Sequence, residues 1–385
     1  MKLVYIYHSL AYKGGLERIF CDKMNYLVRN CSYDITFITY EQGNHPLSYN
    51  IDDRIKVIDL DTRFVTLFKY NVLLRFFKSI SLKRLLIKRL AETLKNEKPD
   101  LVVCATYEFY ISECILDLPF NFIVESHLCM NAVLSSKLHN DFFVSSVAKL
   151  FDLWHFSKIN KAKVLVTLTE ADKKDWGKHI TTDIMVIPNM VTCYPDKITP
   201  YIERPKRIIC AGRLDEQKGF DYLIEAWALI AKKFPDWKID IFGHGDLKDA
   251  LNKMIANRKL ENQMEIHNPT DRIYDEYMNS SIYVMSSRYE GFGLVLIEAM
   301  SCGVPCISFD CPNGPSEIIR SGENGLLVPL ADIEKLSNSI EWMINHKADR
   351  DRMSLNARLS TTQYQAEKIM PRWVKLFDDV IKMQI

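Results

Sequence analysis

Short apolar segments that alternate with helical patterns constrain the fold of this chain more than any other feature. Thirteen such runs, each rich in Val, Ile, Tyr or Phe, are separated by longer segments with helical periodicity. Because the runs are apolar on both faces, we expect parallel strands in sheets that helices cover on both sides. The expected strands are 2–8, 34–40, 56–60, 100–106, 121–126, 164–169, 183–188, 207–211, 237–243, 263–267, 281–286, 305–309 and 325–329.

The runs fall into two groups, and the residues between the groups resemble neither. Residues 191–206 contain three prolines, mixed charge and no periodicity, which is typical of a linker. The strand–helix alternation then restarts at Arg207. The sequence therefore predicts an α/β protein with two Rossmann-like, doubly wound domains facing a cleft. We expect the domains at 1–190 and 207–361, with a last helix in 362–385 that crosses back to the first domain.

Composition excludes several classes of protein. A chain of 385 residues with 48% hydrophobic and 26% charged residues is typical of a folded globular protein of two or three domains. A net charge of +1 gives no field that would attract nucleic acid. No apolar run approaches the ~18 residues of a membrane-spanning helix, and the N-terminus resembles a first strand rather than a signal peptide. Ten cysteines without CxxC or metal-binding spacing indicate reduced thiols, so we expect a cytoplasmic protein.

Two glycine-containing segments follow expected strands and precede expected helices. Gly14 and Gly15 come after the first strand, and Gly212 comes directly after the first strand of the second domain. In an open α/β sheet, ligands bind at these carboxyl ends, where a helix N-terminus offers free N–H groups to a phosphate. Arg213 and Lys218 would grip a diphosphate through a guanidinium fork and a point charge. Tight turns with solvated surface charges are the alternative at both segments.

A third segment has two glutamates on either side of a Gly-x-Gly turn. Glu290 precedes the turn, and the amides of Phe292, Gly293 and Leu294 would open a helix toward an anion. Glu298 lies further along that helix among apolar residues, where an unpaired buried carboxylate is costly. A ribose diol or hexose hydroxyls would supply the donors it needs. The alternative is a glutamate near the helix start that faces water.

Together these segments resemble glycosyltransferase family 4, and bacterial surface-polysaccharide enzymes in particular. Members of this family are retaining enzymes with the two-domain GT-B fold, and the resemblance covers nearly the whole chain. Two segments depart from the family pattern: residues 268–270 lack the usual glycine, and residues 310–317 are closer to members that handle galactose or N-acetylgalactosamine. The matching stretches are GGLER (14–18), KPDLVVCAT (98–106), VTLTEADKKDW (166–176), VIPN (186–189), CAGRLDEQKGFDYLIEAW (210–227), SSRYEGFGLVLIEAMSCGVPCISFD (286–310) and GPSEIIRSGENGLLVP (314–329).

The resemblance implies a role for each candidate residue. Arg213 and Lys218 would bind the donor diphosphate, Glu290 the sugar hydroxyls and Glu298 the ribose hydroxyls. His127, in the VESH segment at the end of a strand, would face sugar and acceptor, although a lone histidine is more often structural. The remaining donor contacts would come from Gly14, Gly15, Gly212, Phe292, Gly293 and Leu294.

The resemblance implies a retaining mechanism, and the same residues favour one without a metal or a cofactor. No Asp or Glu in the motifs is an evident nucleophile, so the departing diphosphate would be stabilised by Arg213, Lys218 and a helix N-terminus. No DxD-like pair follows a strand. We therefore expect transfer of a hexose or N-acetylhexosamine from a nucleotide-diphosphate sugar, with UDP as the expected nucleotide, to a glycan. The alternatives are a GT-B epimerase or hydrolase and a non-catalytic nucleotide-sugar-binding protein.

Residues 63–98 concentrate positive charge, with ten basic and two acidic side chains. Phe64, Phe68, Phe76 and Phe77 interleave with these cations and exceed what one core-facing stripe uses. A basic helix with apolar residues at three- and four-residue steps can lie in a membrane interface. This pattern predicts a peripheral protein at an anionic membrane surface, the inner face of the plasma membrane. Because the resemblance implies that this domain binds the acceptor, we expect a lipid-linked glycan acceptor. A helix with one buried stripe and a solvated basic face is the alternative.

Overall fold

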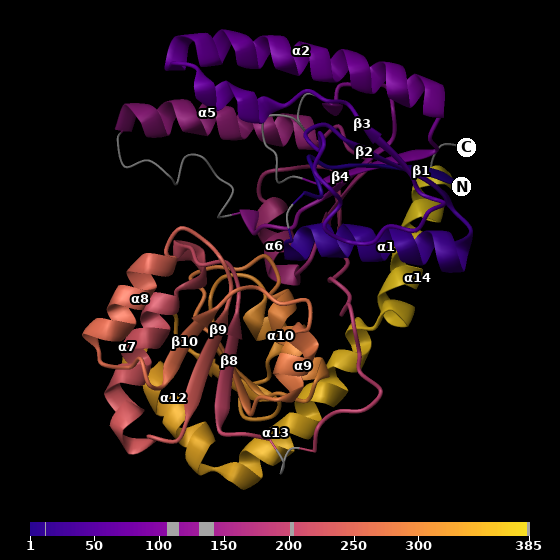
Figure 1. Ribbon diagram of the computed structural model, residues 1–385. Coiled ribbons are helices and arrows are strands. Elements are labelled where there is room, and N and C mark those ends of the chain that lie inside the picture. Colours follow the sequence, from indigo (N-terminus) through magenta and orange to yellow (C-terminus); the bar gives the residue numbers. More distant parts are fainter. Residues whose placement is uncertain (12, 106–114, 131–141, 201–203, 383–385) are drawn as a thin grey trace. The chain divides into compact units, whose positions relative to one another are not determined.

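Two compact units make up the chain in this computed structural model (Figure 1). The first unit contains Met1–Pro188 and Ala366–Ile385, and the second contains Asn189–Gln365. The structure describes all residues except 12, 106–114, 131–141, 201–203 and 383–385, and it does not describe the side chains of residues 72 and 142–148.

The first unit is built on a seven-stranded parallel sheet with the order β3–β2–β1–β4–β5–β6–β7. Because the order reverses between β1 and β4, the carboxyl ends of these two strands form a topological switch point. The strands are β1 (Lys2–Ile6), β2 (Asp34–Thr39), β3 (Lys56–Asp59), β4 (Leu101–Ala105), β5 (Phe122–Glu125), β6 (Val164–Thr167) and β7 (Asp183–Val186). The helices are α1 (Gly15–Cys31), the 3-10 helix η1 (Phe64–Lys69), α2 (Val72–Glu97), α5 (Phe142–Ile159), α6 (Glu170–Trp176) and α14 (Ala366–Lys382).

The second unit has a six-stranded parallel sheet with the order β10–β9–β8–β11–β12–β13 and a switch point between β8 and β11. The strands are β8 (Arg207–Ala211), β9 (Lys238–Phe242), β10 (Met264–His267), β11 (Ile282–Met285), β12 (Cys306–Phe309) and β13 (Gly325–Val328). The helices are η4 (Glu216–Lys218), α7 (Phe220–Ile230), η5 (Ala231–Lys233), α8 (Lys248–Asn257), α9 (Ile273–Met278), α10 (Leu294–Ser301), α11 (Pro315–Ile318), α12 (Ile333–Asn345), α13 (Lys347–Ser360) and η6 (Thr361–Tyr364).

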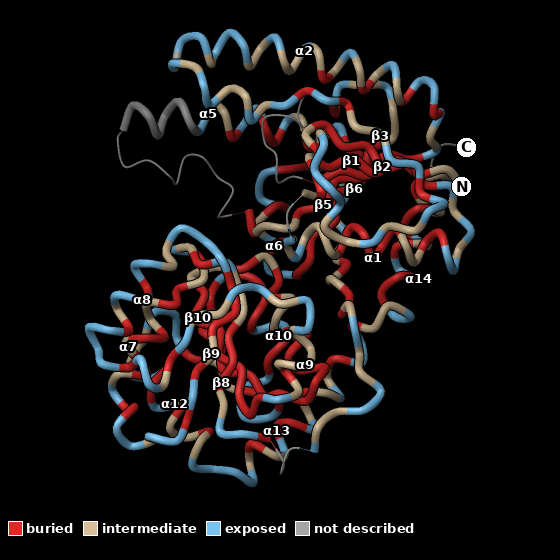
Figure 2. Tube along the Cα trace, viewed as in Figure 1, coloured by how far each residue is buried: buried red, intermediate tan, exposed pale blue. Residues whose placement is uncertain are grey.

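The core of each unit lies on and around its sheet, and Figure 2 shows the central strands as its most buried segments. In the first unit, Leu86, Leu90 and Leu94 of α2 pack into the same apolar cluster as Val4 of β1. Their four-residue spacing puts them on one helix face, and burying each leucine stabilises the fold by about 1.5–3 kcal/mol. The C-terminal half of α2 is therefore the part of this helix that anchors it to the sheet.

All thirteen predicted strands are present, and they form two parallel sheets as expected. The α/β fold class is thus confirmed, with each strand shorter than or equal to its predicted run. Thr106, the last residue of the KPDLVVCAT stretch, lies outside the described residues. Within the described part of the chain, no helix is long and apolar enough to cross a bilayer.

The described residues of the segment predicted as a linker, 191–200 and 204–206, are grouped with the second unit. The Val191 N–H donates to the carbonyl oxygen of Tyr364 at 2.8 Å. The buried guanidinium of Arg204 donates to the carbonyl oxygens of Cys302 and Gly303 at 2.6 and 2.9 Å. The prolines interrupt helical periodicity in this segment, but hydrogen bonds still hold Val191 and Arg204 against the second unit.

The last helix, α14, begins at Ala366 and is grouped with the first unit, whereas residues 361–364 form η6 of the second. Figure 1 shows α14, in yellow, beside α1. The Phe377 ring lies 6.4 Å from Tyr33 near the end of α1, and Trp373 is 3% exposed. The predicted apolar stripe is thus buried in the first unit, although Ile381 at its end is only half-buried.

Candidate functional site

The loop after β8 carries the two cations that the sequence singled out. Asp215 accepts a hydrogen bond from the Lys218 N–H at 3.2 Å and so caps η4. The Arg213 guanidinium donates to Gln217 Oε1 at 2.8 Å and lies 3.2 Å from Asp215, with 54% of its side chain exposed. A Cβ at Gly212 would lie 3.2 Å from the Lys218 side chain, so the glycine lets the lysine stem lie against the backbone. The loop therefore holds Arg213 and Lys218 at the carboxyl end of β8.

Lys218 reaches a glutamate on a distant loop. Its Nζ lies 2.8 Å from Glu290 Oε1, and the two side chains are 16% and 7% exposed. Gln217 donates to the carbonyl oxygen of Tyr289 at 3.0 Å, which ties the two loops together. No donor among the described residues contacts Glu290 Oε2. Because a buried pair is favourable only when its remaining lone pairs and protons are satisfied, this pair is suited to polar groups of a ligand.

The turn before α10 depends on two glycines with positive φ. Gly293 caps the helix with φ 93°, and no side chain in the described part of the chain accepts from the first N–H groups of α10. Gly314, with φ 118°, lies so close to Phe292 that a Cβ would be 2.1 Å from the Phe292 carbonyl oxygen. This close packing fixes the turn that leads to Leu294. The anion site that the sequence predicts at the amides of 292–294 stays a prediction, and a helix N-terminus without a side-chain cap is compatible with it.

Glu298 is buried on α10, with 5% of the residue exposed. The Tyr277 hydroxyl of α9 donates to Glu298 Oε2 at 3.4 Å. Burial and the nearby Glu298 charge raise the pKa of Tyr277 well above its usual value, so this hydroxyl keeps its proton at neutral pH. The alternative of a glutamate that faces water is wrong, because Glu298 is buried and its carboxylate lies against Tyr277.

In the first unit, Gly14 caps α1 in an extended conformation and Gly15 is the first helical residue. The carboxylate of Glu17 lies next to them, since a Cβ at Gly14 would be 2.2 Å from Glu17 Oε2. Tyr7 donates to the other oxygen of this carboxylate at 3.1 Å. Because the Glu17 carboxylate already lies beside this helix N-terminus, a second anion is disfavoured there.

His127 follows β5 and is held by a buried network. Its Nε2 lies 2.9 Å from Glu125 Oε2, and its ring is 5.7 Å from Phe20 of α1. Glu125 also forms an ion pair with Lys23 of α1 at 2.5 Å. The histidine is therefore neither isolated nor freely solvated, because the last residue of β5 and α1 together fix its position.

Asp172 of α6 holds the loop that contains His127. It accepts hydrogen bonds from the Met130 N–H at 2.8 Å and from the Ser126 hydroxyl at 3.4 Å. Burial raises the pKa of Asp172 to about 6. This carboxylate thus fixes the loop on both sides of the histidine.

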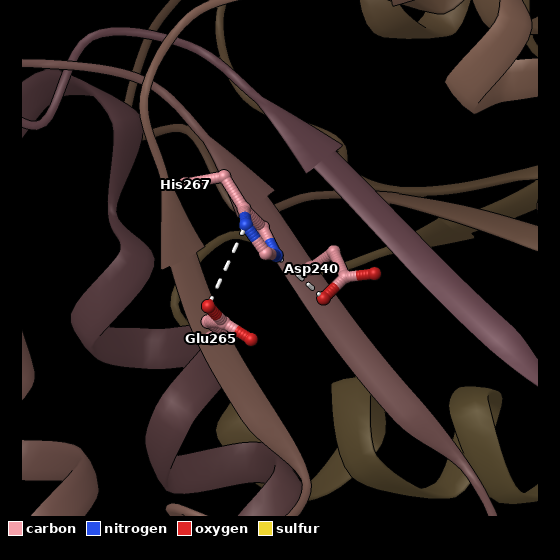
Figure 3. Close-up of side chains that lie close together, drawn as sticks. All are labelled: Asp240, Glu265 and His267. Atoms are coloured by element: carbon pink, nitrogen blue, oxygen red, sulfur yellow. Dashed lines mark hydrogen bonds and ion pairs between the residues drawn. The ribbon is translucent and has the colours of Figure 1, made fainter.

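Asp240, Glu265 and His267 meet on β9 and β10, the one group of three potential metal ligands among the described residues (Figure 3). His267 Nε2 lies 2.9 Å from Asp240 Oδ1, and His267 Nδ1 lies 3.7 Å from Glu265 Oε1. The other oxygen of Asp240 is paired with Arg207 of β8. Because this guanidinium already supplies positive charge, the group is better described as an ion-pair network than as a cation site.

The structure brings three candidates of the second unit into direct contact, Gly212, Lys218 and Glu290, whereas the printed contacts of Arg213 are with Gln217 and Asp215. Sequence reasoning missed the partners Glu125, Lys23, Gln217 and Tyr277. Glu125 left a usable signal, since it ends an otherwise apolar strand two positions before a histidine. Lys23 left one too, because it lies among the apolar positions of the first helix.

Comparisons with known proteins find glycosyltransferases. The family model "Glycosyl transferases group 1" matches residues 196–360. An uncharacterized glycosyltransferase of Haemophilus influenzae is 29% identical over 97% of this chain and 98% of its own length. The amylovoran biosynthesis glycosyltransferase AmsD of Erwinia amylovora is 26% identical, again over 97% of this chain and 98% of its own length.

The fold has solved counterparts. A point mutant of TarM of S. aureus, crystallised with fondaparinux, alpha-GlcNAc-glycerol and UDP, superposes with a TM-score of 0.76 over 98% of this chain and 99% of its own, at 17% identity. At that identity the likeness shows the fold alone, which is GT-B. The second unit therefore carries the group 1 glycosyltransferase sequence pattern, within a chain that is similar to glycosyltransferases along its length and has their two-domain fold.

Proposed function

We propose that this protein is a retaining glycosyltransferase of family 4 that uses a UDP-linked hexose or N-acetylhexosamine. One observation carries the proposal: Lys218 and Glu290 form a nearly buried pair beside Arg213 at the carboxyl end of β8. Two cations suit the diphosphate, and the carboxylate suits the hydroxyls of the sugar. The full-length similarity to glycosyltransferases and the UDP bound by TarM support the choice of reaction and nucleotide.

In this mechanism the bond between the sugar C1 and the diphosphate oxygen breaks as an oxocarbenium-like centre develops. Arg213, Lys218 and the N–H groups that begin α10 stabilise the negative charge on the departing diphosphate. The acceptor hydroxyl attacks from the face that the diphosphate leaves, which retains the configuration at C1. Its proton passes to a phosphate oxygen of the leaving group. Glu298 holds the ribose hydroxyls.

A donor screen tests the proposal. The purified full chain is incubated with UDP-glucose, UDP-galactose, UDP-N-acetylglucosamine, UDP-N-acetylgalactosamine and GDP-mannose, and the melting temperature is measured. We expect one or more UDP-sugars to raise the melting temperature, because a ligand that binds only the folded state stabilises it by mass action. No shift with any UDP-sugar, together with a shift for GDP-mannose, would contradict the proposed nucleotide.

Turnover without an acceptor separates the proposal from its alternatives. An epimerase converts the donor to a second sugar nucleotide, and a hydrolase releases free sugar at a rate that acceptors do not raise. A non-catalytic binding protein leaves the donor intact. We expect slow release of UDP that rises when glycan acceptors are added, measured by chromatography of nucleotides and sugars.

Transfer is proposed to need no divalent metal, because Arg213 and Lys218 supply the charge that Mg²⁺ or Mn²⁺ would supply. Dialysis against EDTA should leave the rate nearly unchanged. The network of Asp240, Glu265 and His267 gives this test a control site. A wild type that loses its rate with EDTA, together with a His267→Gln variant that is already slow without EDTA, would trace a metal effect to that network. Any loss with EDTA would contradict metal independence.

The acceptor is proposed to be a lipid-linked glycan reached at an anionic membrane surface. Six exposed large apolar side chains of the first unit lie on η1 and the start of α2, ahead of the leucines that anchor α2 to the sheet. Phe68 and Leu73 are each 75% exposed, and Phe77 is 66% exposed. Exposed cations lie among them, and each adds about 1 kcal/mol of attraction to an anionic surface. The apolar residues are Val65, Phe68, Leu73, Leu74, Phe76 and Phe77, and the exposed cations are Arg63, Lys69, Lys78, Arg84 and Lys88.

Co-sedimentation with vesicles tests the membrane surface. We expect the wild type to pellet with phosphatidylglycerol vesicles at low salt, to pellet less at high salt, and to stay in solution with phosphatidylcholine. Phe77→Glu should weaken pelleting, whereas Leu359→Glu, an exposed leucine on α13 (65%), is the matched control and should not. Equal pelleting with both lipids, or equal effects of the two variants, would contradict membrane binding and indicate that residues 63–98 only form a solvent-exposed surface.

A further inference from the structure

Three ionisable side chains meet in the interior of the first unit. Lys23 of α1 donates from Nζ to both carboxylate oxygens of Glu125, at 2.5 Å each. The Oε2 atom of the same carboxylate lies 2.9 Å from His127 Nε2. Lys23 and Glu125 are 3% and 1% exposed. An ammonium, a carboxylate and an imidazole are thus joined in that order, away from water.

A buried ion pair of this kind is a poor way to fill a core. Moving the two charges out of water costs several kcal/mol for each ion, and apolar side chains of similar volume often give a more stable protein. Aromatic rings surround the ammonium as well: Lys23 Nζ lies 3.8 Å from the ring centre of Trp373 on α14 and 5.3 Å from that of Phe20. The chain therefore keeps a charge here at a cost in stability, which indicates a role beyond packing.

The protonation of Glu125 determines the state of the histidine. Burial acts to raise the pKa of Glu125, but the Lys23 charge and the contacts with His127 outweigh it and hold the pKa below its ordinary value. The ionised carboxylate can only accept hydrogen bonds. His127 must therefore present Nε2–H to it, and in the neutral ring Nδ1 is then an acceptor. No described residue forms a hydrogen bond with Nδ1.

We propose that Glu125, fixed by Lys23, is a positioning residue that holds His127 as its Nε2–H tautomer, so that Nδ1 accepts a hydrogen bond from a sugar hydroxyl. Trp373 of the last helix also helps to position Lys23, because its ring contacts the Lys23 ammonium. Only the identity of the hydroxyl rests on the proposed glycosyltransferase function. The tautomer itself is a property of the protein without substrate.

The variant Glu125→Gln should change the tautomer of His127, because the amide has one hydrogen-bond acceptor, its oxygen, and one donor, its NH₂ group. The Lys23 ammonium can only donate, so it takes the amide oxygen. The amide N–H₂ then faces His127 Nε2, which must accept, and the ring proton moves to Nδ1. The substitution keeps the shape of the side chain and inverts the tautomer.

Nitrogen-15 NMR of ¹⁵N-histidine-labelled protein at pH 8.5 tests this directly, with the His127 signals assigned from their loss in His127→Asn. In the wild type we expect a protonated Nε2 and a bare Nδ1, and in Glu125→Gln the reverse. Glu97→Gln is the matched control, since Glu97 is a buried glutamate of the same unit that pairs with Lys56 at 2.5 Å and Lys2 at 3.0 Å. It should leave the His127 signals unchanged. A bare Nε2 in the wild type would overturn the proposal without any variant.

Activity gives the second readout. With the donor identified, Glu125→Gln should lower kcat/KM about 10-fold, as expected when the ring can no longer accept a hydrogen bond from the sugar hydroxyl. Glu97→Gln should keep kcat/KM. The double variant Glu125→Gln/His127→Asn should be no slower than His127→Asn, because both changes act through one ring. The wild-type tautomer without transfer to any acceptor would contradict the proposed function and leave the positioning intact. Transfer by a wild type whose His127 Nε2 is bare would contradict the positioning role and leave the proposed function intact.

Discussion

Replacing Arg213 by alanine removes a charge from the loop after β8 with little effect on the fold. The side chain is 54% exposed and contacts Gln217 and Asp215. An exposed ion pair contributes only about 0–1 kcal/mol, and Asp215 keeps its hydrogen bond from the Lys218 N–H. We therefore expect a fall in melting temperature of at most about 3 °C.

The effect on catalysis should be far larger. Removing one electrostatic donor from a site where charge develops costs about 3 kcal/mol, or about 100- to 1,000-fold in kcat. Initial rates of UDP release with the identified donor and acceptor give kcat/KM for the wild type and Arg213→Ala. Arg258→Ala is the matched control, because Arg258 is 52% exposed and paired with Glu225 at 2.7 Å in the same unit. Activity of Arg213→Ala within a few-fold of the control would refute the diphosphate role.

Three further outcomes test the packing that supports the site. Lys218→Met should lower the free energy of unfolding of the second unit by about 3–5 kcal/mol, because it leaves Glu290 buried without its partner. Adding Glu290→Gln should recover part of that loss, as measured by urea unfolding. Burial raises the pKa of Asp172 from 3.8, its value in the unfolded chain, to about 6 in the folded protein. The folded state therefore keeps the Asp172 proton to a higher pH than the unfolded state does. As pH rises from about 4 to about 6, the contribution of this group to the free energy of unfolding falls. Asp172→Asn should therefore be more stable than the wild type at pH 7.5, by up to about 3 kcal/mol relative to their difference at pH 4, and an equal difference at both pH values would contradict the buried charge. Gly219→Ala should destabilise the protein much more than Gly322→Ala, since both have positive φ (61° and 85°) but only a Cβ at Gly219 would meet a backbone oxygen, at 2.1 Å.

The sheets could be predicted from the sequence because the residues of each strand themselves show the apolar pattern of a buried parallel strand. A run such as 207–211 is apolar on both faces, and its position before a glycine and a helical pattern places it in a parallel sheet. The glycines of the 292–294 turn and the apolar neighbours of Glu298 are local signals of the same kind. For this reason the candidate residues of the second unit could be proposed from the sequence.

The partners that complete each site are not local, and the sequence could not pair them. Lys23 and Glu125 are 102 positions apart, and nothing near Lys23 tells which carboxylate neutralises it. The segment 191–206 was predicted as a linker because its prolines interrupt periodicity, yet Arg204 binds carbonyl groups about 100 positions away. Such contacts follow from the topology of the sheets and from the need of buried polar groups for partners.

The central claim is that Arg213 and Lys218 bind the diphosphate of a nucleotide sugar. Calorimetric titration of the full chain with UDP and with uridine tests it most directly, since the two ligands differ only in the diphosphate. We expect UDP to bind at one site at least 100-fold more tightly than uridine, which corresponds to about 2.7 kcal/mol, and we expect Arg213→Ala to remove most of that difference. Equal affinity of the wild type for UDP and uridine, or no binding of UDP, would contradict the claim.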